Sequence, residues 1–150
     1  MNSDFKLLNK RARFDYDIKE IFEVGIVLSG AETKSVRLKH ISLKEAFVKI
    51  TQNGLSLINA TITPYKYADN RNYDPKRSRQ LLIKKKELLR LLKKQEGTNL
   101  TLIPLSIKPY RKYIKLEIGL AAGKKAYQKR EIKRRKDLNR EQQRIIKNLK

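Results

Sequence analysis

The side chains that could do chemistry in this sequence are mostly cations, and they are densest at its end. Residues 124–150 contain twelve Lys or Arg and three Asp or Glu, a net charge of +9. So few apolar side chains lie between them that burial cannot offset the entropy of ordering the segment. We expect this tail to be disordered in free solution and helical on a polyanionic partner. The alternative is a tail that only improves solubility.

Two further segments carry groups that suit contact with nucleic acid. Residues 32–37 are predicted to be a strand with alternating polar side chains, so that Glu32 and Lys34 either meet sugar and phosphate groups or simply face solvent. A polar loop at 64–75 and the residues just after it mix tyrosines with amides and arginines. Unpaired bases stack on such groups, although the tyrosines could instead pack against the fold. These candidates are Tyr65, Tyr67, Asn70, Arg71, Asn72, Tyr73, Arg77 and Arg79.

Catalytic and metal-binding chemistry has few candidates in this sequence. His40 is the only histidine and there is no cysteine, so neither a conventional catalytic pair nor a zinc site can be assembled. No glycine-rich phosphate loop or nucleophile elbow occurs. We therefore predict no enzymatic activity, no cofactor and no metal.

The charge of the whole chain points to a polyanionic partner. Lys and Arg number 37 against 15 Asp and Glu, a net charge of +22 over 150 residues. Nucleic acid is favoured over an anionic membrane surface or an acidic protein. No segment has the length and apolar character of a signal peptide or a membrane span, so we predict a cytoplasmic protein without a membrane partner.

Three segments that could position these groups are predicted to be helical. Residues 12–22 place apolar side chains at helical spacing, and residues 42–46 open with a capping serine and make about one turn. The strongest pattern is at 76–95, where leucines recur at helical steps.

The remaining apolar segments are predicted to be strands. Residues 24–28 form one, and residues 46–63 form a hairpin that turns at Asn53-Gly54. Two more lie at 99–107 and 113–120, the second with clean alternation of apolar and polar side chains. The predicted fold is mainly β with α: a small OB-like antiparallel β-barrel over residues 1–123, about three flanking helices, and the basic C-terminal tail at 124–150.

Short stretches spread over nearly the whole chain occur together in a characteristic order and spacing. They are Asn9 with Ala12, Gly25–Leu28, Glu32, Lys34-Ser35, Arg37, Asn59, Ile62, Pro64-Tyr65, Asn72, Asp74-Pro75, Arg77, Arg79, Leu81-Leu82, Pro104-Leu105, Gly119–Ala121, Gly123–Lys125, Tyr127 and Lys129–Glu131. In this combination the sequence resembles the SsrA-binding protein (small protein B) family. The resemblance implies a monomeric, non-enzymatic protein with an OB-like barrel.

The resemblance also implies partners. The family binds the tRNA-like domain of transfer-messenger RNA and, with elongation factor Tu, delivers it to stalled ribosomes for trans-translation. The tail then occupies the decoding centre (16S rRNA) and the empty mRNA path. Implied RNA-binding residues are Asn9, Glu32, Lys34, Arg37, Tyr65, Asn72 and Arg77, and implied ribosomal residues are Gly123, Lys124, Lys125, Tyr127, Lys129 and Arg130.

This sequence departs from the family pattern at four positions. Gln128 stands where the family usually has Asp, which removes a charge beside the predicted decoding-centre contacts. Lys39 replaces a usual Gly, so we expect the turn there to be built differently. Lys84 replaces His and Ala31 replaces Thr.

Two other functions remain as alternatives for the same residues. A ribosomal protein or ribosome-assembly factor that binds rRNA fits the composition equally well. An RNA-modifying or RNA-cleaving enzyme would need an acid–base or metal constellation that these residues do not offer.

Overall fold

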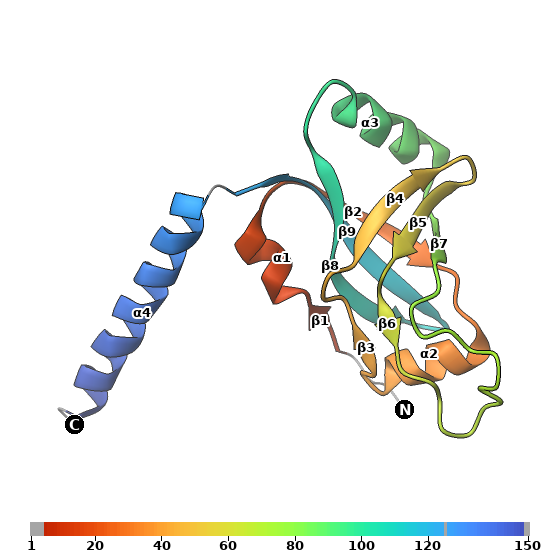
Figure 1. The fold of residues 1–150 in the computed structure, drawn as a ribbon, viewed down its shortest axis with the longest axis horizontal. Helices are drawn as coiled ribbons and strands as arrows, with labels where there is room; N and C mark the ends of the chain where they lie inside the picture. Colours follow the sequence, from red (N-terminus) through yellow and green to blue (C-terminus); the bar gives the residue numbers. More distant parts are fainter. Residues whose placement is uncertain (1–4, 125, 149–150) are drawn as a thin grey trace.

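The computed structural model describes residues 5–124 and 126–148. Within them the chain forms four helices and nine strands, with the last helix extending away from the sheet (Figure 1). In chain order these are β1 (Leu7–Leu8), α1 (Lys10–Asp15), β2 (Tyr16–Ile26), α2 (Gly30–Arg37), β3 (Ile41–Ser42), β4 (Phe47–Thr51), β5 (Gly54–Ile58), β6 (Thr61–Ile62), β7 (Arg79–Leu82), α3 (Lys85–Gln95), β8 (Thr101–Tyr110), β9 (Tyr113–Gly123) and α4 (Ala126–Asn148).

One large antiparallel sheet forms the body of the molecule. Its seven strands follow the order β1-β8-β4-β5-β7-β2-β9, and β9 also pairs with β8. The pairings therefore run from β8 through β4, β5, β7, β2 and β9 back to β8, as a ring that leaves few free strand edges. The antiparallel sheet with flanking helices is confirmed, in a mixed α/β chain.

The interior of the ring is filled from alternate strand positions. Ile114, Leu116, Ile118 and Leu120 of β9 are each no more than 3% exposed, which confirms the predicted inward face of this strand. Both final strands are confirmed, and both run three residues past their predicted ends. The predicted hairpin is confirmed as β4–β5, where Gly54 has a φ of 111° that favours glycine.

The predicted helix at 12–22 is wrong beyond its first turn. α1 ends at Asp15, and β2 begins at Tyr16 and pairs with β9 over most of its length. The register shifts between Ile18 and Glu20, but side chains of β2 still alternate between buried and exposed. The conformation of these residues is decided by pairing with β9, about a hundred residues later in the sequence. The local spacing of apolar residues carries no information about such a distant partner.

The predicted helix at 76–95 is wrong in its first part. Residues Arg79–Leu82 are strand β7, which joins β5 to β2, and the helix α3 begins only at Lys85. Leu91 of α3 is buried, and Arg90 and Lys94 form ion pairs with Glu20 of β2. These contacts hold α3 at one end of the sheet.

The extended conformation predicted at 32–37 is also wrong, because residues Gly30–Arg37 form α2. The helix begins with a capping box between Ser29 and Glu32. The single helical turn predicted at 42–46 is likewise replaced by a turn in which Glu45 has a φ of 64°.

The turn after α2 keeps a conformation that favours glycine although its residue is Lys39. Lys39 has a φ of 66°, its N–H donates to the Val36 carbonyl at 2.9 Å, and the His40 N–H donates to the Ser35 carbonyl at 2.9 Å. These two bonds are a Schellman motif. The expectation of a differently built turn is therefore wrong: the lysine adopts the left-handed backbone at a cost in strain.

Candidate nucleic-acid interface

Glu32 lies in the first turn of α2 and faces the interior. Its backbone N–H donates to Ser29 Oγ at 3.2 Å, and the Ser29 N–H donates to Glu32 Oε1 at 3.0 Å. The residue is 1% exposed. The solvent-facing position that we predicted for Glu32 is therefore wrong, because the capping box turns its carboxylate back toward the start of the helix.

Two arginines and a tyrosine meet the buried carboxylate. Arg79 donates to Glu32 Oε2 from Nε at 3.0 Å and from Nη2 at 2.6 Å. Arg77 donates from Nε to Oε2 at 3.2 Å and from Nη2 to Oε1, and the Tyr73 hydroxyl lies 3.2 Å from Oε2. Both carboxylate oxygens are thus satisfied, as a buried charge requires. We call Glu32, Tyr73, Arg77 and Arg79 the Glu32 network.

Arg79 also ties the network to the backbone around it. Its Nη1 donates to the Ala60 carbonyl at 2.6 Å and its Nη2 donates to the Pro75 carbonyl at 2.9 Å. The side chain is completely buried. One guanidinium therefore connects α2, the β5–β6 link and the end of the 64–75 loop.

The charges of the network are set by these contacts. Burial by itself raises the pKa of Glu32, but hydrogen bonds from Arg77, the Ser29 N–H and Arg79 outweigh it, and the pKa falls from 4.5 to about 2. Burial and the neighbouring carboxylate raise the pKa of Tyr73 above its usual value. At neutral pH one carboxylate thus faces two guanidinium groups, which leaves one surplus positive charge. The side chain of Arg77 is 40% exposed, so that surplus lies at the surface.

Aromatic rings and a lysine lie on the two segments that the Glu32 network joins, helix α2 and the loop that leads to Arg77. Lys34 Nζ of α2 lies 5.4 Å from the centroid of the Tyr65 ring, and the Tyr65 and Tyr67 rings meet edge to face at 5.6 Å. Tyr67 is 78% exposed. Asn70 Nδ2 donates to the Tyr65 carbonyl at 2.8 Å, which holds the loop in this shape. We call Lys34, Tyr65, Tyr67 and Arg77 the α2–loop surface.

Two other predicted RNA-binding residues, Arg37 and Asn72, lie on the same two segments as this surface. Arg37, at the end of α2, donates from Nη2 to the Arg111 carbonyl at 2.6 Å. Asn72 is exposed on the loop and lines a shallow hollow with Arg71 and Tyr73.

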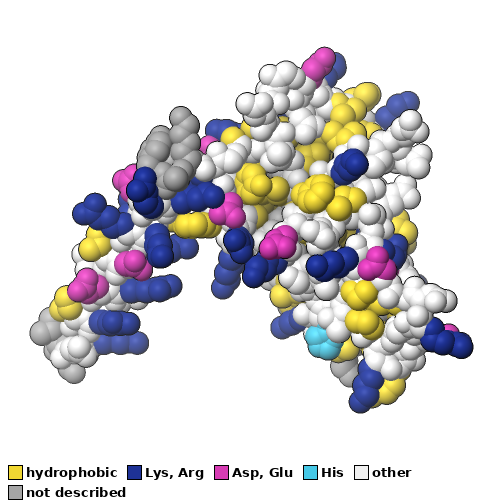
Figure 2. Space-filling view, in the orientation of Figure 1, with side chains coloured by type: hydrophobic (Ala, Val, Ile, Leu, Met, Phe, Trp, Pro, Cys, Tyr) yellow, Lys and Arg dark blue, Asp and Glu magenta, His cyan; other side chains and the backbone are white. Residues whose placement is uncertain are grey.

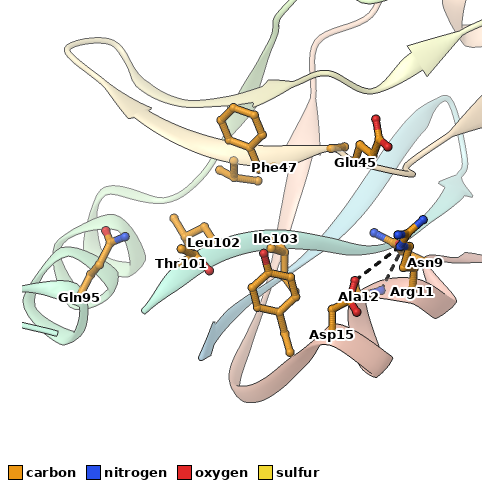
Figure 3. A pocket seen from close by; sticks show the side chains of 13 residues that line it. Asn9, Arg11, Ala12, Asp15, Glu45, Phe47, Gln95, Thr101, Leu102 and Ile103 are labelled. Carbon is orange, nitrogen blue, oxygen red and sulfur yellow. Dashed lines mark hydrogen bonds and ion pairs between the residues drawn. The ribbon is translucent and has the colours of Figure 1, made fainter. Parts of the chain in front are cut away.

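Asn9 lies apart from the α2–loop surface. It caps α1 and donates from Nδ2 to the Pro104 carbonyl at 2.9 Å, so the structure shows it holding α1 against β8. It lines a cavity of about 470 Å³ between α1, the start of β4 and the start of β8 (Figure 3). The Arg11–Asp15 pair lies on the α1 side of this cavity and Phe47 on the β4 side.

The start of the basic tail lies against α1. Gly123 pairs with Tyr16 in the sheet, and the Lys124 N–H and Nζ donate to the carbonyls of Asp15 and Arg13, both at 2.9 Å. Lys129 Nζ lies 3.2 Å from Asp15 Oδ1. Beyond these contacts α4 presents Arg130 and a row of further cations to solvent (Figure 2). Lys125 and the side chain of Tyr127 lie outside the described part of the chain.

Comparison with known proteins decides the family. The family model described as SmpB protein matches residues 6–148. The SsrA-binding protein of Enterococcus hirae is 44% identical over 147 residues, which cover 97% of this chain and 96% of that one. The SsrA-binding protein of Pseudothermotoga lettingae is 46% identical and covers 88% of this chain and 89% of its own. This chain belongs to the SsrA-binding protein family.

The structure of this chain is also similar to that of a solved chain. It comes from work on tmRNA–SmpB in the bacterial ribosome, is 46% identical, and matches with a TM-score of 0.66 over 81% of this chain and 85% of its own length. The family match includes the basic tail as well as the sheet. Membership in this family confirms the prediction of a binding protein rather than an enzyme.

Within the described residues no helix combines the length and apolar character needed to cross a membrane. Over the same ranges no three His, Cys, Asp or Glu side chains are grouped so that they could hold a metal ion.

Sequence reasoning missed the residues that organise the site. The sequence does carry a signal for the first of them, because Ser29-x-x-Glu32 is a capping-box pattern that predicts a helix start. The second is Arg79, which in the sequence is one of several cations in and after the 64–75 loop. Nothing local in the sequence indicates that it is buried against a glutamate 47 residues earlier.

Proposed function

We propose that this chain binds the tRNA-like domain of transfer-messenger RNA through the α2–loop surface and delivers that RNA to stalled ribosomes in trans-translation. The observation that carries the proposal is the Glu32 network beneath this surface. It ties Arg77, with its surplus positive charge, to α2, the helix whose Lys34 contacts the Tyr65 ring. Family membership and the SsrA-binding relatives support the choice of RNA.

The mode of recognition follows from the groups presented. Lys34 and Arg77 suit phosphate oxygens, and Tyr65 and Tyr67 suit the faces of unpaired bases in an RNA loop. Glu32 takes part by fixing the position of Arg77 and of α2, and not by contact with the RNA. Arg37, at the end of α2, and Asn72, on the 64–75 loop, extend the surface, and Asn9 contributes by placing α1.

The rest of the assembly is proposed on the family resemblance. The sheet ring is an OB-like barrel, and the protein acts as a cytoplasmic monomer in a delivery complex with elongation factor Tu. The tail over 124–150 then enters the decoding centre and the empty mRNA path. Gly123, Lys124, Lys125, Tyr127, Lys129 and Arg130 make the first contacts there. The bonds of Lys124 and Lys129 to α1 give the tail a defined starting point.

Binding to two RNAs of similar size tests the proposal. Full-length protein is titrated into labelled tRNA-like domain of transfer-messenger RNA and, separately, into a tRNA of similar length. We expect clearly tighter binding of the first, and equal affinities would contradict the proposal. Lys34→Ala should weaken binding to the tRNA-like domain and lower the slope of log affinity against log salt by about 0.7–0.9. Lys49→Ala, which removes the same charge from an exposed position on β4, is the matched control and should have less effect.

Deletion of residues 124–150 separates the two proposed tasks. We expect RNA binding to be largely retained and tagging of peptides on stalled ribosomes to be lost. Sedimentation tests the alternative of a structural ribosomal protein: a stoichiometric amount on salt-washed ribosomes would favour that alternative, and a substoichiometric amount favours an adaptor.

A further inference from the structure

The tip of the β8–β9 hairpin carries two exposed tyrosines that the α2–loop surface does not include. Tyr110 and Tyr113 are directly paired across the strands and are 49% and 68% exposed. A fold that only needed to close a turn would gain nothing from two large rings in solvent. Exposed rings in a strongly basic chain are characteristic of surfaces on which bases stack.

Two lysines lie on the same face of the hairpin as the tyrosines, two residues away from them along each strand. Lys108 pairs with Lys115, and Ile114 between the paired positions is buried, so these lysines and both tyrosines lie on the outer face of the hairpin. Like charges directly opposite each other destabilise a strand pair. Glu23 Oε2 lies 3.6 Å from Lys108 Nζ and offsets only part of this repulsion because its side chain is 51% exposed.

The turn itself adds two more cations and is tied to α2. Arg111 has a φ of 54°, which is unfavourable for a residue with a Cβ, and its guanidinium lies 5.4 Å from the centroid of the Tyr110 ring. The Arg111 carbonyl accepts the hydrogen bond from Arg37 at 2.6 Å. The hairpin tip is thus held beside the helix that carries Lys34.

We propose that this tip is a second RNA-binding surface, which stacks one or two unpaired nucleotides on its tyrosines and holds their phosphates with its cations. Its residues are Lys108, Tyr110, Arg111, Lys112, Tyr113 and Lys115, with four positive and no negative charges. The inference rests on the proposed function in that RNA is the partner. An acidic protein segment would use the cations but has no need of two exposed rings. Because Arg37 joins the tip to α2, one RNA molecule can contact both surfaces.

Photocrosslinking tests the stacking directly. A single-stranded oligoribonucleotide of ten nucleotides containing 5-iodouridine is irradiated with the unaltered full chain, and the crosslinked residues are mapped by mass spectrometry. Because this chain has seven tyrosines and no tryptophan, attachment identifies the rings that contact bases. We expect crosslinks at Tyr110 or Tyr113. Crosslinks at other tyrosines alone would overturn the inference.

Two matched double variants measure the contribution of the rings. The double variant Tyr110→Ala with Tyr113→Ala should bind the same oligonucleotide at least about tenfold more weakly, because each base that stacks on an aromatic side chain adds to the affinity. Tyr110→Phe with Tyr113→Phe keeps both rings and should bind like the unaltered protein. Equal affinity of the Ala variant and the unaltered chain would overturn the inference, and so would binding of a polyglutamate peptide in preference to the oligonucleotide.

The two proposals fail separately. If no crosslinks form at the tip and the Ala variant still prefers the tRNA-like domain, the second surface is excluded and the proposed function stands. If crosslinks form at the tip but the protein binds both structured RNAs equally, the second surface stands and the proposed function is excluded.

Discussion

The guanidinium of Arg79 lies 2.6 Å from Glu32 Oε2, and neither side chain is exposed to solvent. The two residues are 47 positions apart in the sequence, on α2 and β7. A buried pair of this kind contributes little net stability compared with well-packed apolar residues, but it determines where its two elements lie. Here it sets the position of α2 against the loop that carries Tyr65.

Removal of the charge of Glu32 should destabilise the protein strongly. Glu32→Gln keeps the size of the side chain but leaves Arg79 buried without its counter-charge, so we expect the free energy of unfolding to fall by about 3 kcal/mol. Urea unfolding followed by circular dichroism measures this. Ser29→Ala is the control, because it removes the hydroxyl that caps α2 and retains the ion pair. Its cost should be about 1 kcal/mol. Equal losses for the two variants would show that the pair has no special role.

The low pKa of Glu32 predicts a defined dependence of stability on pH. Since its pKa is about 2 in the folded protein and 4.5 in its usual state, the unfolded chain binds the proton first as pH falls. The stabilising contribution is therefore complete above about pH 4.5 and is lost as pH falls from there toward 2. The difference in unfolding free energy between the unaltered protein and Glu32→Gln should shrink over this window. A difference that stays constant from pH 7 to 2 would contradict the pKa.

Glycine at position 39 should stabilise the protein. Lys39 has a φ of 66° at the end of α2, and a left-handed backbone costs a residue with a Cβ about 1–2 kcal/mol. Lys39→Gly relieves this cost, while Lys39→Ala keeps it, and both remove the contact of Lys39 Nζ with the Phe5 ring. We expect the Gly variant to unfold at a higher temperature than the Ala variant, and the reverse order would show that the turn is not strained.

Two glycines of β9 should respond differently to a methyl group. A Cβ at Gly119 would lie 2.9 Å from Leu105 Cδ1 and 3.2 Å from Ile18 Cγ2, whereas nothing lies within 4 Å of one at Gly123. Because Leu105 is 1% exposed and has little room to move, Gly119→Ala should cost about 1–3 kcal/mol, as overpacking does. Gly123→Ala should be close to neutral in the same thermal melts. A comparable loss at Gly123 would point to a backbone effect common to both sites.

The tail helix should be the least protected helix of the free protein. Leu138, Ile145 and Ile146 of α4 are each at least 50% exposed, so little burial supports the helix. An isolated helix of this kind is marginal in water. Amides of residues 130–148 should therefore exchange with deuterium much faster than those of β8 and β9, and should slow when ribosomes are added. Protection in the free protein equal to that of the sheet would contradict a tail that is ordered by its partner.

Much of the sheet could be predicted because its signals are local. The Asn53-Gly54 turn and the alternation of β9 each depend on a few neighbouring residues, and both are confirmed. Residues 16–22 and 79–82 form strands although their apolar spacing predicts helix, because their partners in β9, β5 and β2 lie far away in the sequence. Strand formation there is decided by pairing and burial and not by propensity.

By itself the sequence determined the chemistry of this protein: a surplus of cations, aromatic residues among them, and neither cysteine nor a histidine pair for catalysis. Together with the spacing of its motifs this was enough to indicate RNA and the family. Only the tertiary structure decided which of the candidate side chains face a partner. Glu32 and Arg79 are charged residues of the kind usually found at a surface. They are nevertheless buried together, because two opposite charges from distant segments satisfy each other in the interior. Arg77, two residues before Arg79, keeps part of its side chain and the surplus charge at the surface.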